Sequence, residues 1–384
     1  MRQNNRTIVL IGTTAASVYG FRSDFIKFLV SQDWQVYTLI CEYSADELEK
    51  ISALGAIAIT YKMSRGGLNP LADMRSMFEL RKKISEIQPD IVFSYFTKPV
   101  IYGTLAAKLA KVPKIIGMIE GLGTPFTILK NGQTAKIKLI QKAQVFLYRL
   151  AFPLLDKIIF LNPDDPVDLI HQHRIRHKPE AIEVLGAIGL NLQEYSYQAW
   201  DEKTSVSFIF IARLLAEKGI FEYVEAAKIV KEKYPKTIFT VIGGLDTENP
   251  NALKEYELAE LISMDIIDYP GFVSDVAQRI KHSAVFVLPS YYREGVPRST
   301  QEAMAVGRPV ITTDVTGCRE TVIDGINGFL VPKWNPEALA DKMIYFIEHP
   351  ELVNKMGQES HKIAVERFDS DKVNYRLVKL LELI

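Results

Sequence analysis

Short apolar runs alternate with amphipathic stretches along the first half of the chain. Buried strands are predicted at the apolar runs 7–12, 34–40, 56–61 and 89–94. Helices are predicted where apolar residues recur at helical spacing, at 21–30, 45–54 and 74–87. This alternation indicates a doubly wound parallel sheet, because each connection must cross back over a face of the sheet.

The same alternation restarts in the second half, after a polar segment. Residues 193–204 are polar and show no periodicity, so we interpret them as a linker. Further strands are predicted at 206–212, 237–242, 268–272, 285–288 and 310–313. The predicted fold class is therefore α/β, with two Rossmann-like domains at residues 1–195 and 204–370.

Composition narrows the possible classes of function. A length of 384 residues suits two domains, and a net charge of +0 argues against a nucleic-acid-binding protein, which carries a basic excess. Cys41 and Cys318 are the only cysteines, so neither a disulfide framework nor a cysteine-based metal site is expected. We read no export signal and no uncharged apolar run of membrane-spanning length, so we expect a cytoplasmic protein.

Two carboxylates, Glu294 and Glu302, stand on either side of a predicted helix start. An apolar run at 284–290 predicts a strand before them, and the helix that follows ends at Gly307. Carboxylates repel phosphate, so these two side chains need neutral hydroxyl partners. The hydroxyl groups of sugar and ribose rings fit that requirement.

The same helix start offers a site for an anion. Pro297 suits the first helical turn, because its missing N–H is one of the donors that no helix can pair there. Three N–H groups next to it would attract a diphosphate, those of Arg298, Ser299 and Thr300. A nucleotide sugar combines a diphosphate with a ring at each end, so it fits the whole segment.

A second loop supplies positive charge. Arg213 follows the predicted strand 206–212, and Lys218 stands just before a predicted helix that begins at Ile220. The carboxyl edge of a parallel sheet is its usual ligand edge, so two fixed cations there can hold a diphosphate and stabilise the charge that develops as it leaves. The alternative is an ordinary solvated turn.

These motifs together resemble the retaining glycosyltransferases of family 4, which have the GT-B fold. The resemblance rests on the Arg213/Lys218 loop, on the spacing of Glu294 and Glu302, and on the segments PVITTDVTGCRE and DGINGFLVP that follow. Shorter segments are similar to one branch of the family, at 20–22, 64–70, 97–103 and 120–123. Enzymes of that branch extend polyprenyl-diphosphate-linked saccharides for bacterial capsules, O-antigens or glycoproteins.

The resemblance implies two domains that face each other across a cleft, with the final helix, 371–384, packing back on the first. The second domain would bind a nucleotide sugar, with UDP as the expected nucleotide, and the first a polyprenyl-diphosphate-linked saccharide. The implied reaction transfers a hexose or N-acetylhexosamine with retention at the anomeric carbon. It is expected to need neither a metal nor any other cofactor.

The resemblance also implies roles for individual residues. Glu294 would bind the transferred sugar and Glu302 the ribose, while the two cations would hold the diphosphate. Glu120 is a further catalytic candidate, but many family members carry a histidine there, so its role stays open. The remaining donor-binding candidates are Gly12, Gly243, Val273, Gly295, Val296, Arg298, Ser299 and Thr300.

Several interpretations remain open. Gly12 follows the first strand without the G-x-G-x-x-G spacing of dinucleotide-binding enzymes, so an oxidoreductase is not indicated. It either makes the turn or lets a diphosphate approach the backbone. A hydrolase or epimerase that acts on the nucleotide sugar without an acceptor is the alternative enzyme. A non-catalytic nucleotide-sugar-binding module is the alternative outside enzymes.

Basic residues in the first half raise the possibility of a membrane partner. The stretch 130–149 mixes cations with apolar residues and can lie on an anionic membrane surface; the alternative is a core helix whose lysines face solvent. Arg65 and Lys98 can meet the acceptor's diphosphate or be ordinary surface charges. The histidines at 171–177 have basic neighbours that would repel a metal cation. The acidic residues at 162–165 suit a helix cap, so no metal site is expected there either.

Overall fold

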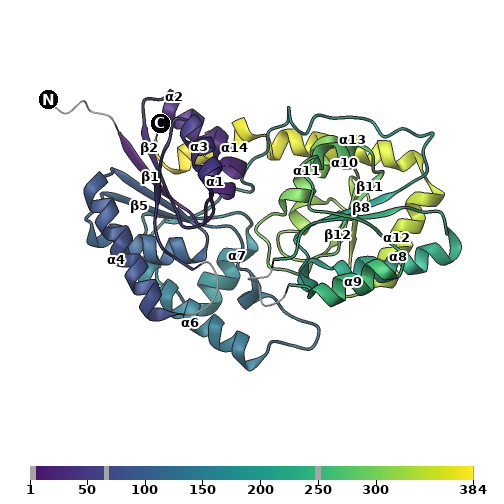
Figure 1. Cartoon of the computed structure of the whole chain (residues 1–384), viewed down its shortest axis with the longest axis horizontal. Coiled ribbons are helices and arrows are strands. Elements are labelled where there is room, and N and C mark those ends of the chain that lie inside the picture. The colour runs from purple at the N-terminus through teal and green to yellow at the C-terminus, as the bar shows by residue number, and fades with distance from the viewer. Residues whose placement is uncertain (1–5, 65–68, 247–251, 384) are drawn as a thin grey trace. The chain divides into compact units, whose positions relative to one another are not determined.

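The computed structural model describes residues 6–64, 69–246 and 252–383. Arg65, one of the two acceptor candidates among the cations, lies outside the described residues. The chain folds into two compact units, each described by itself (Figure 1). The first comprises Met1–Pro125, Thr134–Gly189 and Ser370–Ile384, and the second comprises Phe126–Gln133 and Leu190–Asp369.

A seven-stranded parallel sheet forms the centre of the first unit, in the order β3-β2-β1-β4-β5-β6-β7. Its strands are β1 (Thr7–Ile11), β2 (Gln35–Ile40), β3 (Ile57–Thr60), β4 (Ile91–Tyr95), β5 (Lys114–Ile119), β6 (Lys157–Phe160) and β7 (Ile182–Val184). The chain winds outward from β1 to β3 and then returns to the other side of β1. The winding direction therefore reverses between β1 and β4, where doubly wound sheets bind ligands.

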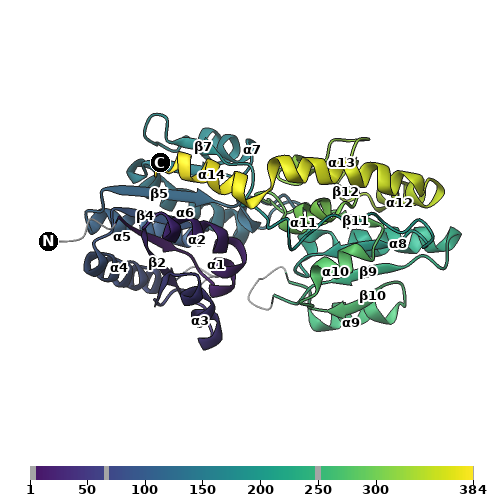
Figure 2. The ribbon, with the colours of Figure 1, turned by 90° about the horizontal axis from the view of Figure 1, so that it is seen from above.

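Helices connect these strands. They are α1 (Ala15–Phe21), α2 (Ser23–Ser31), α3 (Ala45–Ala53), α4 (Pro70–Ile87), α5 (Thr104–Leu109), α6 (Ala135–Ala151), α7 (Asp164–Pro166) and α14 (Ser370–Leu380), with π-helical turns at Pro99–Gly103 and Val167–His171 and 3-10 turns at Thr124–Phe126 and Phe152–Leu154. Side-chain caps fix several starts: Asn69 accepts from the N–H of Ala72 at α4, and Thr134 from that of Ile137 at α6. The yellow helix α14 contacts α2 and lies among the elements of the first unit in both views (Figure 2).

The helix predicted at 21–30 differs from the structure. Thr14 caps a short helix that ends at Phe21, and α2 starts only at Ser23. Arg22 between them has φ −123° and ψ 0°, which breaks the helix. This break places the Arg22 side chain in the interior, where it is 2% exposed.

The second unit contains a six-stranded parallel sheet in the order β10-β9-β8-β11-β12-β13. Its strands are β8 (Phe208–Ile211), β9 (Phe239–Ile242), β10 (Asp268–Gly271), β11 (Val285–Leu288), β12 (Val310–Thr313) and β13 (Gly328–Val331). Here the winding direction reverses between β8 and β11. Both of these strands are buried along their whole length, as expected for a parallel sheet covered on both faces.

The helices of the second unit are α8 (Ile220–Lys233), α9 (Glu255–Ser263), α10 (Val276–Lys281), α11 (Arg298–Val306), α12 (Pro336–Glu348) and α13 (Glu351–Arg367), with 3-10 turns at Ala216–Lys218 and Arg319–Thr321. The polar segment predicted as a linker is held in this unit by hydrogen bonds that its backbone N–H groups donate. The Trp200 N–H donates to Asn354 Oδ1 at 2.9 Å, and the Gln198 N–H donates to the Val306 carbonyl at 3.0 Å. The chain passes between the units earlier, at Gly189/Leu190, and 126–133 also lies in the second unit.

Candidate active site

The reversal point of the second sheet brings together the two motifs that carry most of the sequence argument. Arg213 follows β8, and the segment from Ser290 to Glu294 follows the neighbouring strand β11. Because parallel strands end at the same edge, both loops lie at the carboxyl edge of the sheet. The 3-10 turn Ala216–Lys218 brings Lys218 to the same place.

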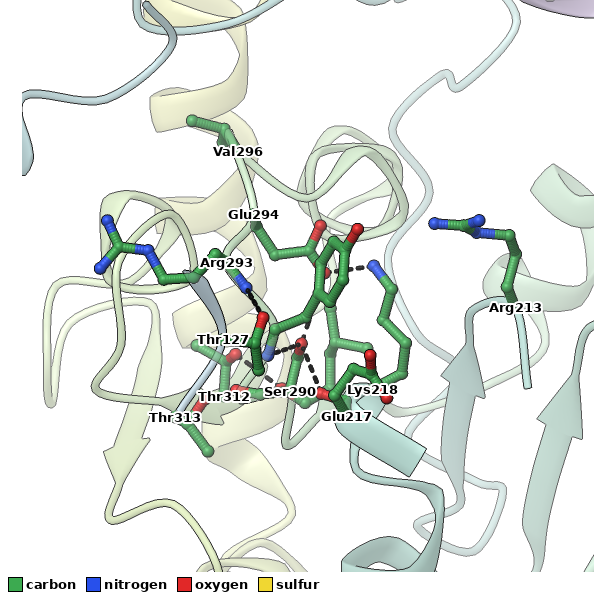
Figure 3. A network of polar contacts seen from close by, with 12 residues as sticks. Thr127, Arg213, Glu217, Lys218, Ser290, Arg293, Glu294, Val296, Thr312 and Thr313 are labelled. Atoms are coloured by element: carbon green, nitrogen blue, oxygen red, sulfur yellow. Dashed lines mark hydrogen bonds and ion pairs between the residues drawn. The ribbon is translucent and has the colours of Figure 1, made fainter. Parts of the chain in front are cut away.

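Lys218 and Glu294 form an ion pair, and their side chains point toward one another in Figure 3. Each side chain is only 11% exposed. The Lys218 ammonium also lies 5.0 Å from the centre of the Tyr292 ring. Burying a charge pair costs desolvation energy that the mutual attraction does not reliably return, so such a pair is weak evidence for a stabilising role. Its position points instead to a role in binding.

Ser290 is a residue of this site that the sequence argument missed. Its fully buried hydroxyl lies 3.3 Å from Oε1 of Glu294 and 3.2 Å from the carbonyl oxygen of Glu217, and it accepts a hydrogen bond of 3.2 Å from the N–H of Tyr292. The hydroxyl therefore helps to hold the carboxylate in place. Its place at the end of a buried strand, four residues before Glu294, was the available signal.

Arg213 takes a different partner from Lys218. Its guanidinium pairs with Oδ2 of Asp246 at 2.6 Å, and about half of the side chain is exposed. Asp246 follows β9, the strand next to β8. Arg213 is therefore held at the sheet edge by an acid, with enough exposure to turn toward a ligand.

Glu302 lies inside helix α11 and is held by two donors. Nε of Arg298 donates to its Oε1 at 3.0 Å. Burial raises the pKa of the Glu302 carboxyl, whereas the charge of Arg298 and hydrogen bonds from Arg298 and Tyr195 lower it, with a net rise. Tyr195 comes from the segment that was predicted to be a linker, so its part in the site was not foreseen.

The first turn of α11 begins at Arg298, so Pro297 stands one position before the first helical turn in which it was predicted. Pro297 is the N-cap residue, and a proline side chain cannot accept a hydrogen bond from the first turn. Thr300 is fully buried, and its Oγ1 has no hydrogen-bond partner among the described residues. Ser299 stands between it and Arg298 in this turn. Just before the helix come Gly295 and the buried Val296, whose carbonyl accepts from Gln301 at 3.1 Å.

Gly243 and Val273 follow β9 and β10, on the other side of β8 from Glu294. A side chain at Gly243 would meet the carbonyl oxygen of Ala212 at 1.9 Å, so packing alone explains this glycine. Val273 is half-buried two residues after β10. Both residues stand at the edge that carries Arg213.

The first unit carries a second group of candidates at the carboxyl edge of its own sheet, after β1 and β5. Gly12 follows β1, and a side chain there would meet the Tyr95 hydroxyl at 2.4 Å. Glu120 follows β5 and forms an ion pair with Arg22, whose guanidinium lies 4.7 Å from the centre of the Tyr95 ring. Burial raises the pKa of Glu120, and Arg22 partly opposes this rise. Glu120 is thus a buried acid with one fixed cationic partner.

Lys98 is not an ordinary surface charge. Its ammonium lies 2.8 Å from Oδ1 of Asp73, and the two side chains are 12% and 3% exposed. The Tyr102 hydroxyl donates to the other oxygen of Asp73 at 3.3 Å, and burial raises the pKa of Tyr102 to about 12. The pair leaves Lys98 at the start of the π-helical turn Pro99–Gly103.

Within 6–64, 69–246 and 252–383, no three His, Cys, Asp or Glu side chains are grouped so that they could hold a metal ion. Asn162 accepts a hydrogen bond from the N–H of Asp165 at 2.9 Å, although the N-cap residue of α7 is Pro163. In the same part of the chain, no helix is both long and apolar enough to cross a bilayer.

Comparisons with known proteins identify the family. Residues 197–363 match the model of glycosyl transferases group 1, and residues 8–162 match that of the glycosyl transferase 4-like family. EpsD of Bacillus subtilis, named as a glycosyltransferase, is 33% identical over 376 residues, which cover 94% of this chain and 92% of EpsD. The chain therefore belongs to the glycosyltransferases, as the sequence motifs predicted.

Two further relatives have more specific names. The N,N'-diacetylbacillosaminyl-diphospho-undecaprenol alpha-1,3-N-acetylgalactosaminyltransferase of Campylobacter jejuni is 29% identical and covers 98% of both chains. The UDP-Gal:alpha-D-GlcNAc-diphosphoundecaprenol alpha-1,3-galactosyltransferase of Escherichia coli is 29% identical over 78% of this chain and 76% of its own.

Solved structures confirm the GT-B fold. Anabaena Alr3699/HepE, in complex with UDP and glucose, matches 99% of this chain and 100% of its own with a TM-score of 0.76 and 15% identity. Sucrose-phosphate synthase from Thermosynechococcus elongatus matches 99% of both chains with a TM-score of 0.79 and 15% identity.

Proposed function

We propose that this glycosyltransferase moves a hexose or N-acetylhexosamine from a UDP-sugar to a saccharide linked to a polyprenyl diphosphate, with retention at the anomeric carbon. The observation that carries the proposal is the buried Lys218–Glu294 pair at the reversal point of the second sheet. The two named relatives, whose acceptors are diphospho-undecaprenol-linked sugars and whose products are alpha-linked, support the acceptor class and the stereochemistry.

The polar residues of the candidate site then have separate roles in this proposal. Glu294 accepts hydrogen bonds from hydroxyl groups of the transferred sugar, and Glu302 accepts them from the ribose. Lys218 and the helix start at Arg298 hold the diphosphate, and Arg213 turns toward it from Asp246. These groups stabilise the negative charge that develops on the phosphate oxygen as the bond to the anomeric carbon breaks.

The acceptor attacks from the face that the diphosphate leaves. A new bond forms between the anomeric carbon and the acceptor oxygen while the bond to the phosphate oxygen breaks. The leaving phosphate oxygen takes the proton of the acceptor hydroxyl, so no protein nucleophile is needed. On this proposal Glu120 and Lys98 belong to the acceptor side, where Lys98 faces the lipid-linked diphosphate.

Transfer should not depend on a divalent cation. Lys218, Arg213 and the α11 start supply positive charge where the diphosphate leaves. We expect an excess of EDTA to leave the initial rate within about twofold, with EDTA plus magnesium as the control for non-specific effects. Complete loss in EDTA that added magnesium or manganese restores would contradict this part of the proposal.

The pKa of Glu302 predicts how UDP affinity depends on pH. Glu302 must be ionised to accept two ribose hydrogen bonds, and its pKa is raised. UDP affinity should therefore fall as the pH drops through this raised value, earlier than for an exposed glutamate. In Arg298→Met, which removes the cation that lowers this pKa, the loss should begin at a still higher pH.

Isothermal titration of UDP between pH 4.5 and 8 tests this expectation. Glu302→Gln serves as the control, because it keeps the titration of UDP itself and removes that of residue 302. If the wild-type and Glu302→Gln proteins lose UDP affinity in parallel as the pH falls, the ionisation of Glu302 does not control UDP binding at low pH.

We also propose that the protein binds an anionic membrane surface through α4 and α6. The exposed face of α6 carries Leu139, Phe146 and Leu150 beside its lysines, whereas Val145 and Tyr148 face the core. Leu71, Met74 and Phe78 are exposed at helical spacing on α4. Lys130 lies outside α6, in the segment that belongs to the second unit. Exposed apolar residues with cations beside them fit a lipid headgroup region.

Charge reversal on α6 tests this surface. Each Lys near an anionic surface contributes about 1 kcal/mol, so replacing Lys136, Lys138 and Lys142 by Glu should release the protein from anionic vesicles at low salt and leave UDP affinity unchanged. The matched control replaces three exposed lysines of the second unit by Glu, at Lys203, Lys236 and Lys254. If the α6 variant still sediments with the vesicles, this surface is wrong.

Product analysis tests the function itself. UDP-sugars are incubated with short lipid-linked saccharides, and products are identified by mass spectrometry, with each donor also incubated alone. The proposal expects a one-sugar extension of at least one acceptor. Release of free sugar at the same rate without an acceptor would favour a nucleotide-sugar hydrolase.

A further inference from the structure

The segment Phe126–Gln133 belongs to the second unit, although it lies in sequence between β5 and α6 of the first. Its two leading side chains are buried, Phe126 at 7% exposure and Thr127 at 0%. Nε2 of Gln133 donates to the carbonyl oxygen of Thr127 at 3.1 Å, which closes the segment on itself. A stretch from the acceptor half of the sequence is therefore built into the donor unit.

Thr127 reaches the residue next to the sugar-binding carboxylate. Its Oγ1 accepts a hydrogen bond of 3.1 Å from the backbone N–H of Arg293, drawn as a dashed line in Figure 3. Arg293 directly precedes Glu294, whose own N–H donates to the Tyr292 carbonyl at 2.9 Å. The tight turn that presents Glu294 is thus tied at its centre to a hydroxyl from a distant part of the chain.

Gly317 holds the same turn at a second point. Its φ of 80° lies in the left-handed region, and a Cβ there would meet the carbonyl oxygens of Glu294 and Gly295 at 2.7 Å each. This close packing leaves no room for the turn to shift toward Gly317. Ser290 and Lys218 meanwhile hold the carboxylate itself. The Thr127 hydroxyl adds a further fixed point to this turn, at the backbone amide of Arg293.

We propose that Thr127 is a positioning residue for Glu294, acting through the Arg293 amide. The inference rests on the proposed function, because it assigns Glu294 to the transferred sugar. Removing the hydroxyl takes this acceptor away from the partly buried N–H of Arg293 and lets the turn relax. Since a shift of about 1 Å in a reacting group can cost on the order of a hundredfold in rate, a modest relaxation is enough to affect transfer.

The test compares Thr127→Val with Thr127→Ser. Valine keeps the shape and removes the acceptor oxygen, so kcat/KM for the donor sugar should fall about fivefold to twentyfold, the loss expected for one hydrogen bond. Serine keeps the hydroxyl and should stay within about twofold of wild type. UDP affinity should not change in either variant, because Glu302 and the α11 start hold the nucleotide.

Thr204→Val is the matched control, since the Thr204 hydroxyl donates to the Asp201 carbonyl at 2.7 Å on the exposed segment before β8. If Thr127→Val does not fold, Thr127→Ala removes the hydroxyl without placing a methyl group among its polar neighbours. Unchanged kcat/KM in a hydroxyl-free variant, or a parallel loss of Tm, UDP affinity and rate that serine does not rescue, would overturn the positioning role. If the wild type transfers sugar and Thr127→Val has the same kcat/KM, the positioning role is wrong and the proposed function stands. If wild type transfers to no acceptor, the proposed function fails.

Discussion

Replacing Lys218 by methionine should lower the turnover number by about a hundredfold to a thousandfold. Methionine keeps most of the length of the side chain but removes the ammonium group that pairs with Glu294. The variant loses a buried cation where the diphosphate leaves, and losses of this size follow removal of one charge-stabilising group from an enclosed active site. Glu294 also loses its fixed partner, which adds to the defect.

Steady-state kinetics with a fixed acceptor measure this effect. Lys228→Met is the control, because Lys228 also pairs with a glutamate, Glu225 at 2.7 Å, but on the exposed face of α8. Arg213→Ala should cost less, about tenfold to a hundredfold, because Arg213 is half exposed and already has Asp246 as its partner. A Lys218→Met enzyme with wild-type turnover would show that the pair is purely structural.

Replacing Arg308 by methionine should lower the free energy of unfolding by about 3–5 kcal/mol, because several buried carbonyl acceptors lose their donor at about 1–3 kcal/mol each. The Arg308 side chain is fully buried, and burial lowers its pKa to about 10. It donates to four carbonyl oxygens, at 3.2 Å from Ile280, 2.7 Å from Gln198, 3.1 Å from Gly307 and 2.8 Å from Lys281. Methionine fills the space but leaves these buried acceptors without their donor.

Urea unfolding of the variants checks this expectation. Arg308→Lys should recover only part of the loss, since a single ammonium cannot reproduce the fork of the guanidinium. Arg319→Met, at a half-exposed arginine that pairs with Asp314 at 2.8 Å, should stay within about 0.5 kcal/mol. If Arg308→Met unfolds at the same urea concentration as wild type, the polar segment at 198 is not fastened by this side chain.

The strands could be predicted because the central ones are short, apolar and bounded by turns. The runs at 285–288 and 310–313 coincide with β11 and β12. The break in the helix at Arg22 could not be predicted, because the residues on both sides of Arg22 continue a helical pattern. The assignment of residues 126–133 to the second unit could not be predicted either, since local periodicity carries no information about which unit a loop packs against.

The same limit applies to the site. Lys218 and Glu294 were predicted from motifs, and the structure brings them together as an ion pair. Ser290, Thr127 and Tyr195 were not foreseen, because a hydroxyl acquires its role from a partner that sequence spacing does not reveal. Thr127 and Arg293 are 166 residues apart.

The most direct test of the account follows UDP release and saccharide product together, with and without a lipid-linked acceptor. A retaining transferase should release one UDP per sugar transferred, release almost none without acceptor, and form an alpha-linked product from an alpha-linked UDP-sugar. The Glu294→Gln variant should lose transfer while it still binds UDP. Equal UDP release without acceptor, or a beta-linked product, would contradict a retaining transferase built on the Lys218–Glu294 pair.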